Sequence, residues 1–194
     1  MTDKLVIALA QLNPTVGKIG ANLEKLREMR KKAAEEGADL ILTSELYTCG
    51  YPPEDLVRKP QFISSLRSAV EAFASETSDG GPAVLLGTPW VESNRLHNSL
   101  VLIEGGAITT ARHKYDLPNY GVFDEKRVFD PGPMPGPISF KDVRIGVPIC
   151  EDIWTPEVVE CITETGGEII LVPNGSPFEA VSYTHLRAHE TPRY

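Results

Sequence analysis

Residues 4–11 read Lys-Leu-Val-Ile-Ala-Leu-Ala-Gln (KLVIALAQ), an almost unbroken apolar run. A strand with this pattern is buried on both faces, as in a parallel sheet that is covered on both sides. A second apolar run occupies residues 38–44 (ADLILTS), and a third occupies residues 83–90 (AVLLGTPW). We therefore predict three strands that form the interior of a layered fold.

The segments between these runs have the periodicity of helices. Asn22 can cap a first helix, and Gly37 stands where a helix-terminating glycine is expected. Two further helices are predicted over Pro60–Thr77 and Thr155–Thr165. In the first helix, the apolar positions recur at helical spacing: Leu23, Leu26, Met29, Ala33 and Ala34.

A hairpin and two later strands complete the predicted fold. Asn98–Glu104 and Ala107–His113 flank Gly105-Gly106, a dipeptide common in tight hairpin turns. Residues 143–149 and 168–172 are predicted strands, whereas the Pro- and Gly-rich residues 115–137 have no clear period and predict a long loop. Alternating β and α units with a hairpin predict an α/β layered fold with a mixed sheet.

The composition narrows the class of protein. The chain has 194 residues, three Cys and a net charge of −8, which is typical of one reduced, soluble domain or part of one. The acidic charge argues against nucleic acid as a partner. No apolar run approaches the ~20 residues that span a bilayer, and the N-terminus lacks the features of a secretory signal. We therefore expect a cytoplasmic protein with no membrane partner.

The C-terminal residues do not fit the rest of the chain. Residues 181–191 (VSYTHLRAHET) resemble the translation of a sequencing-library adapter, so we assign residues 181–194 to a non-native tail. The alternative is a native polar helix in which His185 and His189 could pair on a metal. Because we favour the adapter origin, we predict no metal site.

Three residues with useful chemistry follow predicted strands: Glu45, Lys114 and Cys150. Functional side chains of α/β sheets gather beyond the carboxyl ends of strands. Each residue could also have no functional role, because a free Cys is most often a small buried residue and a Lys or Glu is most often a solvated surface charge. Brought together, the carboxylate could act as a base, the ammonium could stabilise an oxyanion, and the thiolate could act as a nucleophile.

Three sequence blocks around these residues resemble the signature blocks of the nitrilase, or carbon–nitrogen hydrolase, superfamily. They are TSELYTCGYPPEDL from residue 43, HKYDLPNYGVFDEKRVF from residue 113 and GVPICEDIW from residue 146. Within the superfamily, the order and sequence of these blocks are most similar to those of the glutaminase domains of glutamine-dependent NAD⁺ synthetases. The resemblance implies an α-β-β-α sandwich that is truncated at its C-terminus, with residues 1–180 as a partial hydrolase domain.

The resemblance also implies a role for each matching residue. Glu45 would be the general base, Lys114 the oxyanion-stabilising residue and Cys150 the nucleophile of a triad that hydrolyses the glutamine amide through a thioester. Glu125 would support the lysine and the substrate. The implied substrate-binding residues are Tyr51, Tyr120, Glu151 and Ser176.

Partners and cofactors are implied in the same way. The hydrolytic step would need no metal or organic cofactor. The ammonia would pass to a C-terminal synthetase domain beyond this chain, which would use ATP, Mg²⁺ and deamido-NAD⁺, and the parent enzyme would be a homo-oligomer.

Two alternatives stay open at this point. One is a free-standing amidase or carbamoylase with the same triad, which turnover of simple or N-carbamoyl amides instead of glutamine would indicate. The other is a non-catalytic α/β interaction module or an inactive fragment. Because a missing core strand leaves an apolar edge, we expect the chain as written to be poorly stable and weakly active.

Overall fold

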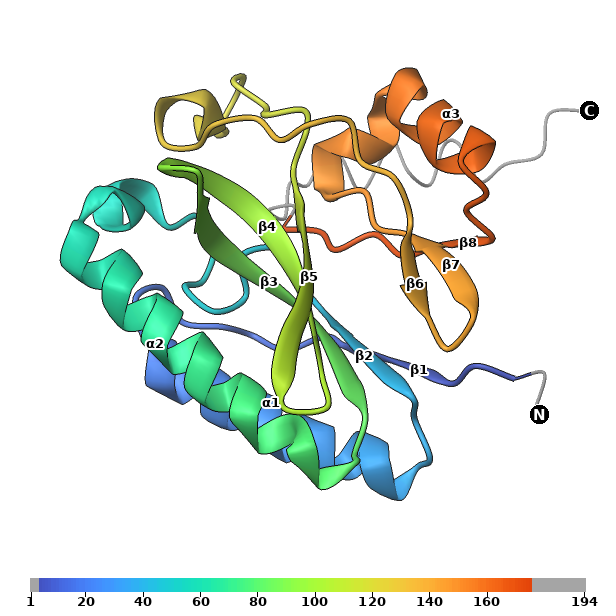
Figure 1. Cartoon of the computed structure of the whole chain (residues 1–194). Helices are drawn as coiled ribbons and strands as arrows, with labels where there is room; N and C mark the ends of the chain where they lie inside the picture. The colour runs from blue at the N-terminus through green and yellow to red at the C-terminus, as the bar shows by residue number, and fades with distance from the viewer. Residues whose placement is uncertain (1–3, 176–194) are drawn as a thin grey trace, which may run out of the picture.

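The computed structural model describes residues 4–175, which form two mixed sheets and three α-helices (Figure 1). The five-stranded sheet contains, in spatial order, β1 (Ile7–Ala10), β2 (Leu40–Thr43), β3 (Ala83–Glu92), β4 (Arg95–Glu104) and β5 (Ala107–His113). The second sheet contains β6 (Ile138–Phe140), β7 (Val143–Gly146) and β8 (Ile169–Ile170). The helices are α1 (Ile19–Glu35), α2 (Pro60–Glu76) and α3 (Pro156–Glu164), and short 3₁₀ turns are η1 (Glu54–Arg58), η2 (Thr77–Asp79), η3 (Glu125–Arg127) and η4 (Cys150–Trp154).

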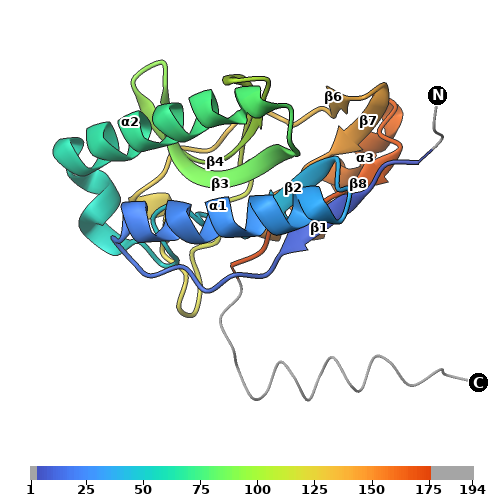
Figure 2. The same cartoon turned by 90° about the horizontal axis from the view of Figure 1, so that it is seen from below.

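The elements stack in layers, with α1 and α2 side by side along one face of the large sheet and the small sheet on the other (Figures 1 and 2). β2 shows why its sequence is apolar throughout. Ile41 packs into the core beneath the helices, whereas Leu40 and Leu42 pack into a second core against β6 and β7. The α/β sandwich is therefore confirmed, and double-sided burial explains the unbroken apolar runs.

Strand direction brings several strand ends to one edge. β1, β2 and β3 are parallel to one another, while β3 and β4, and then β4 and β5, are antiparallel. β5 therefore runs in the same direction as β2. Glu45 lies just beyond the end of β2 and Lys114 just beyond the end of β5, so both residues lie at the same edge of the large sheet.

The expectation that Asn22 caps the first helix is wrong. Lys18 is the N-cap residue, and Asn22 is fully buried inside α1. Its side-chain amide accepts the Thr15 N–H (2.8 Å) and donates to the Thr15 (2.9 Å) and Thr48 (3.1 Å) carbonyls. A cap and a buried bridge use the same Asn chemistry, so the local pattern cannot separate them.

The strands also depart from expectation in three places. The sequence reading missed the turn at Ser93 and Asn94, whose positive φ values of 49° and 61° suit the tight β3–β4 hairpin, and it missed β6. The strand predicted over residues 143–149 ends at Gly146. Its apolar continuation leads into η4, where the Ile149 N–H binds the Asp152 carboxylate instead of a neighbouring strand.

Within residues 4–175, no helix is long and apolar enough to cross a membrane. Ser176 and the tail assigned to residues 181–194 lie outside the described residues.

Candidate active site

A buried lysine between two carboxylates is the centre of the site. Lys114 Nζ lies 2.7 Å from Glu45 Oε1 and 2.9 Å from Glu125 Oε1, and the Lys114 side chain is fully buried. Burial by itself lowers the pKa of Lys114, but the two carboxylates outweigh it and hold the pKa above its ordinary value. Burial, followed by the charge of Glu45, raises the pKa of Glu125. The pair of acids thus keeps an ammonium ion in a water-poor environment.

Asn98 is a member of this cluster that the sequence reading missed. Its Nδ2 donates to Glu45 Oε1 (2.7 Å) and Glu125 Oε2 (3.3 Å), and the side chain is fully buried on β4. The only sequence signal is a polar position next to His97 and Ser99 in an otherwise apolar strand. With Oε1 held by Asn98 and Lys114, Glu45 Oε2 is buried and receives no N–H or O–H bond within residues 4–175.

Glu45 is positioned by a close approach of its backbone to β3. The Gly87 N–H donates to Thr43 Oγ1 (2.9 Å), and the Gly87 carbonyl accepts the Thr48 N–H (3.1 Å). A Cβ at Gly87 would lie 2.2 Å from the Ser44 carbonyl oxygen. Only glycine therefore allows residues 43–48 to cross β3 at this distance.

We expect Gly87→Ala to lower the free energy of unfolding by about 1–3 kcal/mol, because the added methyl must push residues 44–46 away from β3. Gly136→Ala is the matched control, since a Cβ there meets nothing within 4 Å. Urea denaturation of both variants measures the difference. Equal stability of the two variants would show that the crossing at Gly87 is not tight.

Cys150 reaches the same edge from the small sheet. It is the first residue of η4 and is buried. Its backbone φ of 48° is left-handed, a conformation that residues other than glycine rarely adopt. The Cys150 N–H donates to the Pro173 carbonyl (3.0 Å) and the Glu45 N–H to the next carbonyl, that of Asn174 (3.4 Å). One segment thus anchors the backbones of both residues side by side.

The Cys150 thiol is affected by its charged neighbours. Burial and then the charge of Glu45 raise the pKa of Cys150 to about 11, while the ammonium of Lys114 and a hydrogen bond with the Gly175 backbone oppose them. The backbones of Cys150 and Glu45 are bonded to the consecutive carbonyls of Pro173 and Asn174, and Glu45 Oε1 lies 2.7 Å from Lys114 Nζ. The structure therefore brings Glu45, Lys114 and Cys150 together, although the expected strand before Cys150 ends at Gly146 and Cys150 itself begins η4.

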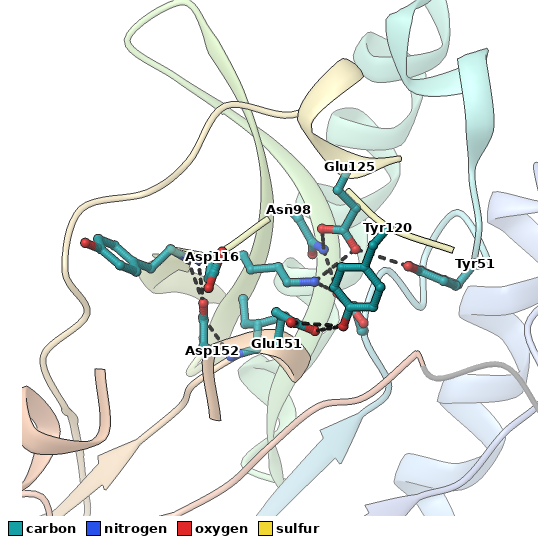
Figure 3. Close-up of polar contacts among 11 residues, drawn as sticks. Tyr51, Asn98, Asp116, Tyr120, Glu125, Glu151 and Asp152 are labelled. Atoms are coloured by element: carbon teal, nitrogen blue, oxygen red, sulfur yellow. Dashed lines mark hydrogen bonds and ion pairs between the residues drawn. The ribbon is translucent and has the colours of Figure 1, made fainter. Parts of the chain in front are cut away.

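The other candidate residues divide into two groups (Figure 3). The Tyr51 hydroxyl donates to Glu125 Oε1 (3.1 Å), which joins Tyr51 to the buried cluster. Tyr120 is exposed, and its hydroxyl binds the Glu151 carboxylate at 2.8 Å, so this pair lies at the outer rim of the site. Phe123 packs against both tyrosine rings, with centroids 6.4 Å and 5.5 Å away. The loop thus supplies side chains both to the cluster and to its entrance.

A thiol, an ammonium and a carboxylate whose Oε2 receives no N–H or O–H bond within residues 4–175 are suited to acyl transfer when they lie at one sheet edge. No group of three His, Cys, Asp or Glu side chains that could hold a metal ion occurs in residues 4–175.

The family model named carbon–nitrogen hydrolase matches residues 6–191. Glutamine-dependent NAD⁺ synthetase of Rhodobacter capsulatus is 41% identical over 178 residues, which are 92% of this chain and 32% of that protein. The glutamine-dependent NAD⁺ synthetase of Thermotoga maritima is 35% identical, and this chain covers 34% of its length. The chain thus spans about a third of the length of these relatives.

Solved structures agree with these matches. The glutamine-dependent NAD⁺ synthetase of Acinetobacter baumannii, solved with ADP, has a TM-score of 0.86 and 34% identity over 93% of this chain and 34% of that one. An amidase from Nesterenkonia has a TM-score of 0.78 and 27% identity over 93% of this chain and 70% of that one. This structure is of a Glu-to-Gln mutant of the amidase, in which acrylamide has undergone Michael addition at the active-site cysteine.

Proposed function

Because this chain belongs to the carbon–nitrogen hydrolase family, we propose that it is the glutamine-hydrolysing part of a glutamine-dependent NAD⁺ synthetase, with Glu45, Lys114 and Cys150 as its triad. The observation that carries the proposal is the buried Lys114 ammonium held by Glu45 and Glu125 beside the Cys150 thiol. The active-site cysteine of the amidase relative supports the assignment of the nucleophile.

The reaction begins with a proton transfer. The raised pKa keeps the Cys150 thiol protonated at neutral pH, so a base must take its proton as the sulfur attacks. Glu45 Oε2 is suited to this task, because the other oxygen is occupied by Lys114 and Asn98. The sulfur then bonds to the side-chain amide carbon of glutamine, and the carbonyl oxygen becomes an oxyanion.

Lys114 and a backbone N–H just after Cys150 stabilise this oxyanion, and one such donor is typically worth about 10²–10³ in rate. Glu45 returns the proton to the amide nitrogen, the C–N bond breaks and ammonia departs. The γ-glutamyl group is then bonded to Cys150 as a thioester. Water, deprotonated by Glu45, then hydrolyses the thioester and releases glutamate. Each proposed step uses residues of this chain and does not need a cofactor.

Tyr51, Tyr120 and Glu151 are proposed to contact glutamine, as is Ser176. Tyr51 is anchored to Glu125, and the Tyr120–Glu151 pair presents a hydroxyl and a carboxylate at the rim. A carboxylate there can bind the substrate's α-ammonium group. The ammonia is proposed to reach an ATP- and Mg²⁺-dependent synthetase domain of a cytoplasmic, homo-oligomeric parent enzyme.

Glu45→Gln should change hydrolysis and thiol acidity in opposite directions. Loss of the base lowers kcat by about 10²–10⁴. The pKa of Cys150 falls below its value of about 11, because the variant removes a negative charge that disfavours the thiolate. The pH dependence of Cys150 alkylation, followed by peptide mass spectrometry, measures the pKa. A variant with unchanged kcat would exclude Glu45 as the base.

The substrate is tested with the full-length protein. We expect glutamate and ammonia to be released in equal amounts from glutamine, and N-carbamoyl or simple aliphatic amides to be turned over far more slowly. If those amides were turned over efficiently and glutamine were not hydrolysed, the result would favour a free-standing amidase. The structural similarity to an amidase also supports this alternative.

A further inference from the structure

The Asp152 carboxylate joins the backbones on the two sides of the proposed site. Its Oδ1 accepts the N–H groups of Tyr115 (3.0 Å) and Asp116 (2.7 Å), and its Oδ2 accepts the Ile149 N–H (3.0 Å). Tyr115 follows Lys114 directly, and Ile149 precedes Cys150. One side chain thus fixes the chain next to two of the three proposed triad residues (Figure 3).

These bonds exceed what the local turn requires. The bond to Ile149 closes η4, but Tyr115 and Asp116 lie 37 and 36 positions away in sequence. Asp152 is 1% exposed, and burial raises its pKa to about 6 although the N–H groups and the Lys114 charge lower it. A carboxylate in such surroundings is unfavourable unless its oxygens are bonded, so all three N–H groups matter for keeping it there.

The Cys150 segment needs support from its neighbours, whereas the Lys114 segment is held by the large sheet and its loop. Cys150 has a φ of 48°, a conformation that persists only when neighbouring contacts over-determine it. Lys114 has left the β5 ladder, and its backbone bonds to Asn98 (2.8 Å) and Gly132 (2.7 Å) belong to the large sheet and its loop. Asp152 is the described side chain that bonds both to the residue before Cys150 and to the residues after Lys114.

We propose that Asp152 is a positioning residue that holds the Lys114 ammonium and the Cys150 thiol in register across the two sheets, without itself touching the substrate. The inference rests on the proposed function, because it takes Lys114 and Cys150 to act on the same carbonyl group. Misplacement of reacting groups by about 1 Å can cost ~10²-fold in rate, which sets the size of the expected effect.

The test compares three variants of the full-length protein. Asp152→Ala removes all three acceptors and should lower kcat for glutamine by about 10²-fold, with KM changed less than about threefold. Asp152→Asn keeps Oδ1 for Tyr115 and Asp116, so it should lose only about tenfold. Thr155→Val is the matched control, since it removes only the bond from Thr155 to the Asp116 carboxylate (2.8 Å), and should stay within about threefold of wild type.

A second readout does not depend on the substrate. If Asp152→Ala loosens the site, the Cys150 thiol becomes better hydrated, and its alkylation pKa falls from about 11 because burial is the main cause of the raised value. A folded Asp152→Ala protein with unchanged kcat and thiol pKa would overturn the proposal. If that variant fails to fold, an Asn variant equal to wild type in both readouts would do so.

The two proposals fail in different ways. Should the wild-type protein leave glutamine unchanged, the proposed function is wrong, and the alkylation pKa of the Asp152 variants still measures whether this side chain links the two segments.

Discussion

Cys150→Ala is expected to abolish glutamine hydrolysis, with a fall in kcat of more than about 10⁴-fold, the range that loss of a nucleophile costs in other covalent hydrolases. The proposed route needs a sulfur that bonds to the amide carbon, and a methyl group cannot replace it. Water attack assisted by Glu45 and Lys114 leaves only slow residual turnover. Glutamate release in a coupled assay measures the loss.

Cys161→Ala is the matched control for this change. Cys161 lies on α3, is partly exposed and forms no disulfide. We expect this variant to keep wild-type activity, and Cys150→Ala to melt as cooperatively as wild type because it removes one small side chain. Substantial turnover by a folded Cys150→Ala protein would rule out a thioester on this residue.

Lys114→Met is expected to impair both catalysis and folding. Without the ammonium, an oxyanion donor is lost, which corresponds to at least about 10²–10³ in kcat. Two buried acids also remain beside each other with no cation between them. Removing one partner of a buried ion pair typically lowers the free energy of unfolding by about 3–5 kcal/mol. Chemical denaturation and glutamine turnover measure the two effects.

The loss of stability in Lys114→Met should depend on pH in a defined direction. Burial and the charge of Glu45 already raise the pKa of Glu125, and removal of Lys114 raises it further. A group whose folded-state pKa is raised gives stability that is present below its unfolded-state pKa and is lost as pH rises through the folded-state value. The deficit relative to wild type should therefore be smaller at pH 5 than at pH 8.

Lys126→Met is the control for charge alone, because Lys126 is exposed on η3 in the same loop region. It should leave stability and turnover within the error of wild type. A Lys114→Met protein as stable as this control at pH 8 would mean that water reaches the acid pair.

The layered fold could be predicted from sequence, because burial on both faces gives each central strand an unbroken apolar run. The positions of Glu45 and Lys114 beyond the ends of β2 and β5 could be predicted as well, whereas β7 ends at Gly146 and Cys150 lies in η4. The contacts between segments could not be predicted. Asn98 and Asp152 bind partners 53 and up to 37 positions away in sequence, and an isolated Asn or Asp carries no local sign of such a partner.

The same limit explains Asn22 and the end of β7. Asn22 has the chemistry of a cap but lies inside α1, where it binds two loops. The apolar residues after Gly146 look like more strand, yet the Asp152 carboxylate takes the Ile149 N–H. Local pattern thus located most of the elements but not β6, whereas long-range polar contacts fixed their ends and assembled the site.

Labelling with a glutamine analogue that carries a diazomethyl ketone in place of the amide would establish which residue attacks the substrate. We expect one equivalent of label per chain on the peptide that contains Cys150, loss of activity in proportion to labelling, and protection by glutamine. Label on another residue that glutamine prevents, or full activity with Cys150 labelled, would contradict the assignment of Cys150 as the nucleophile.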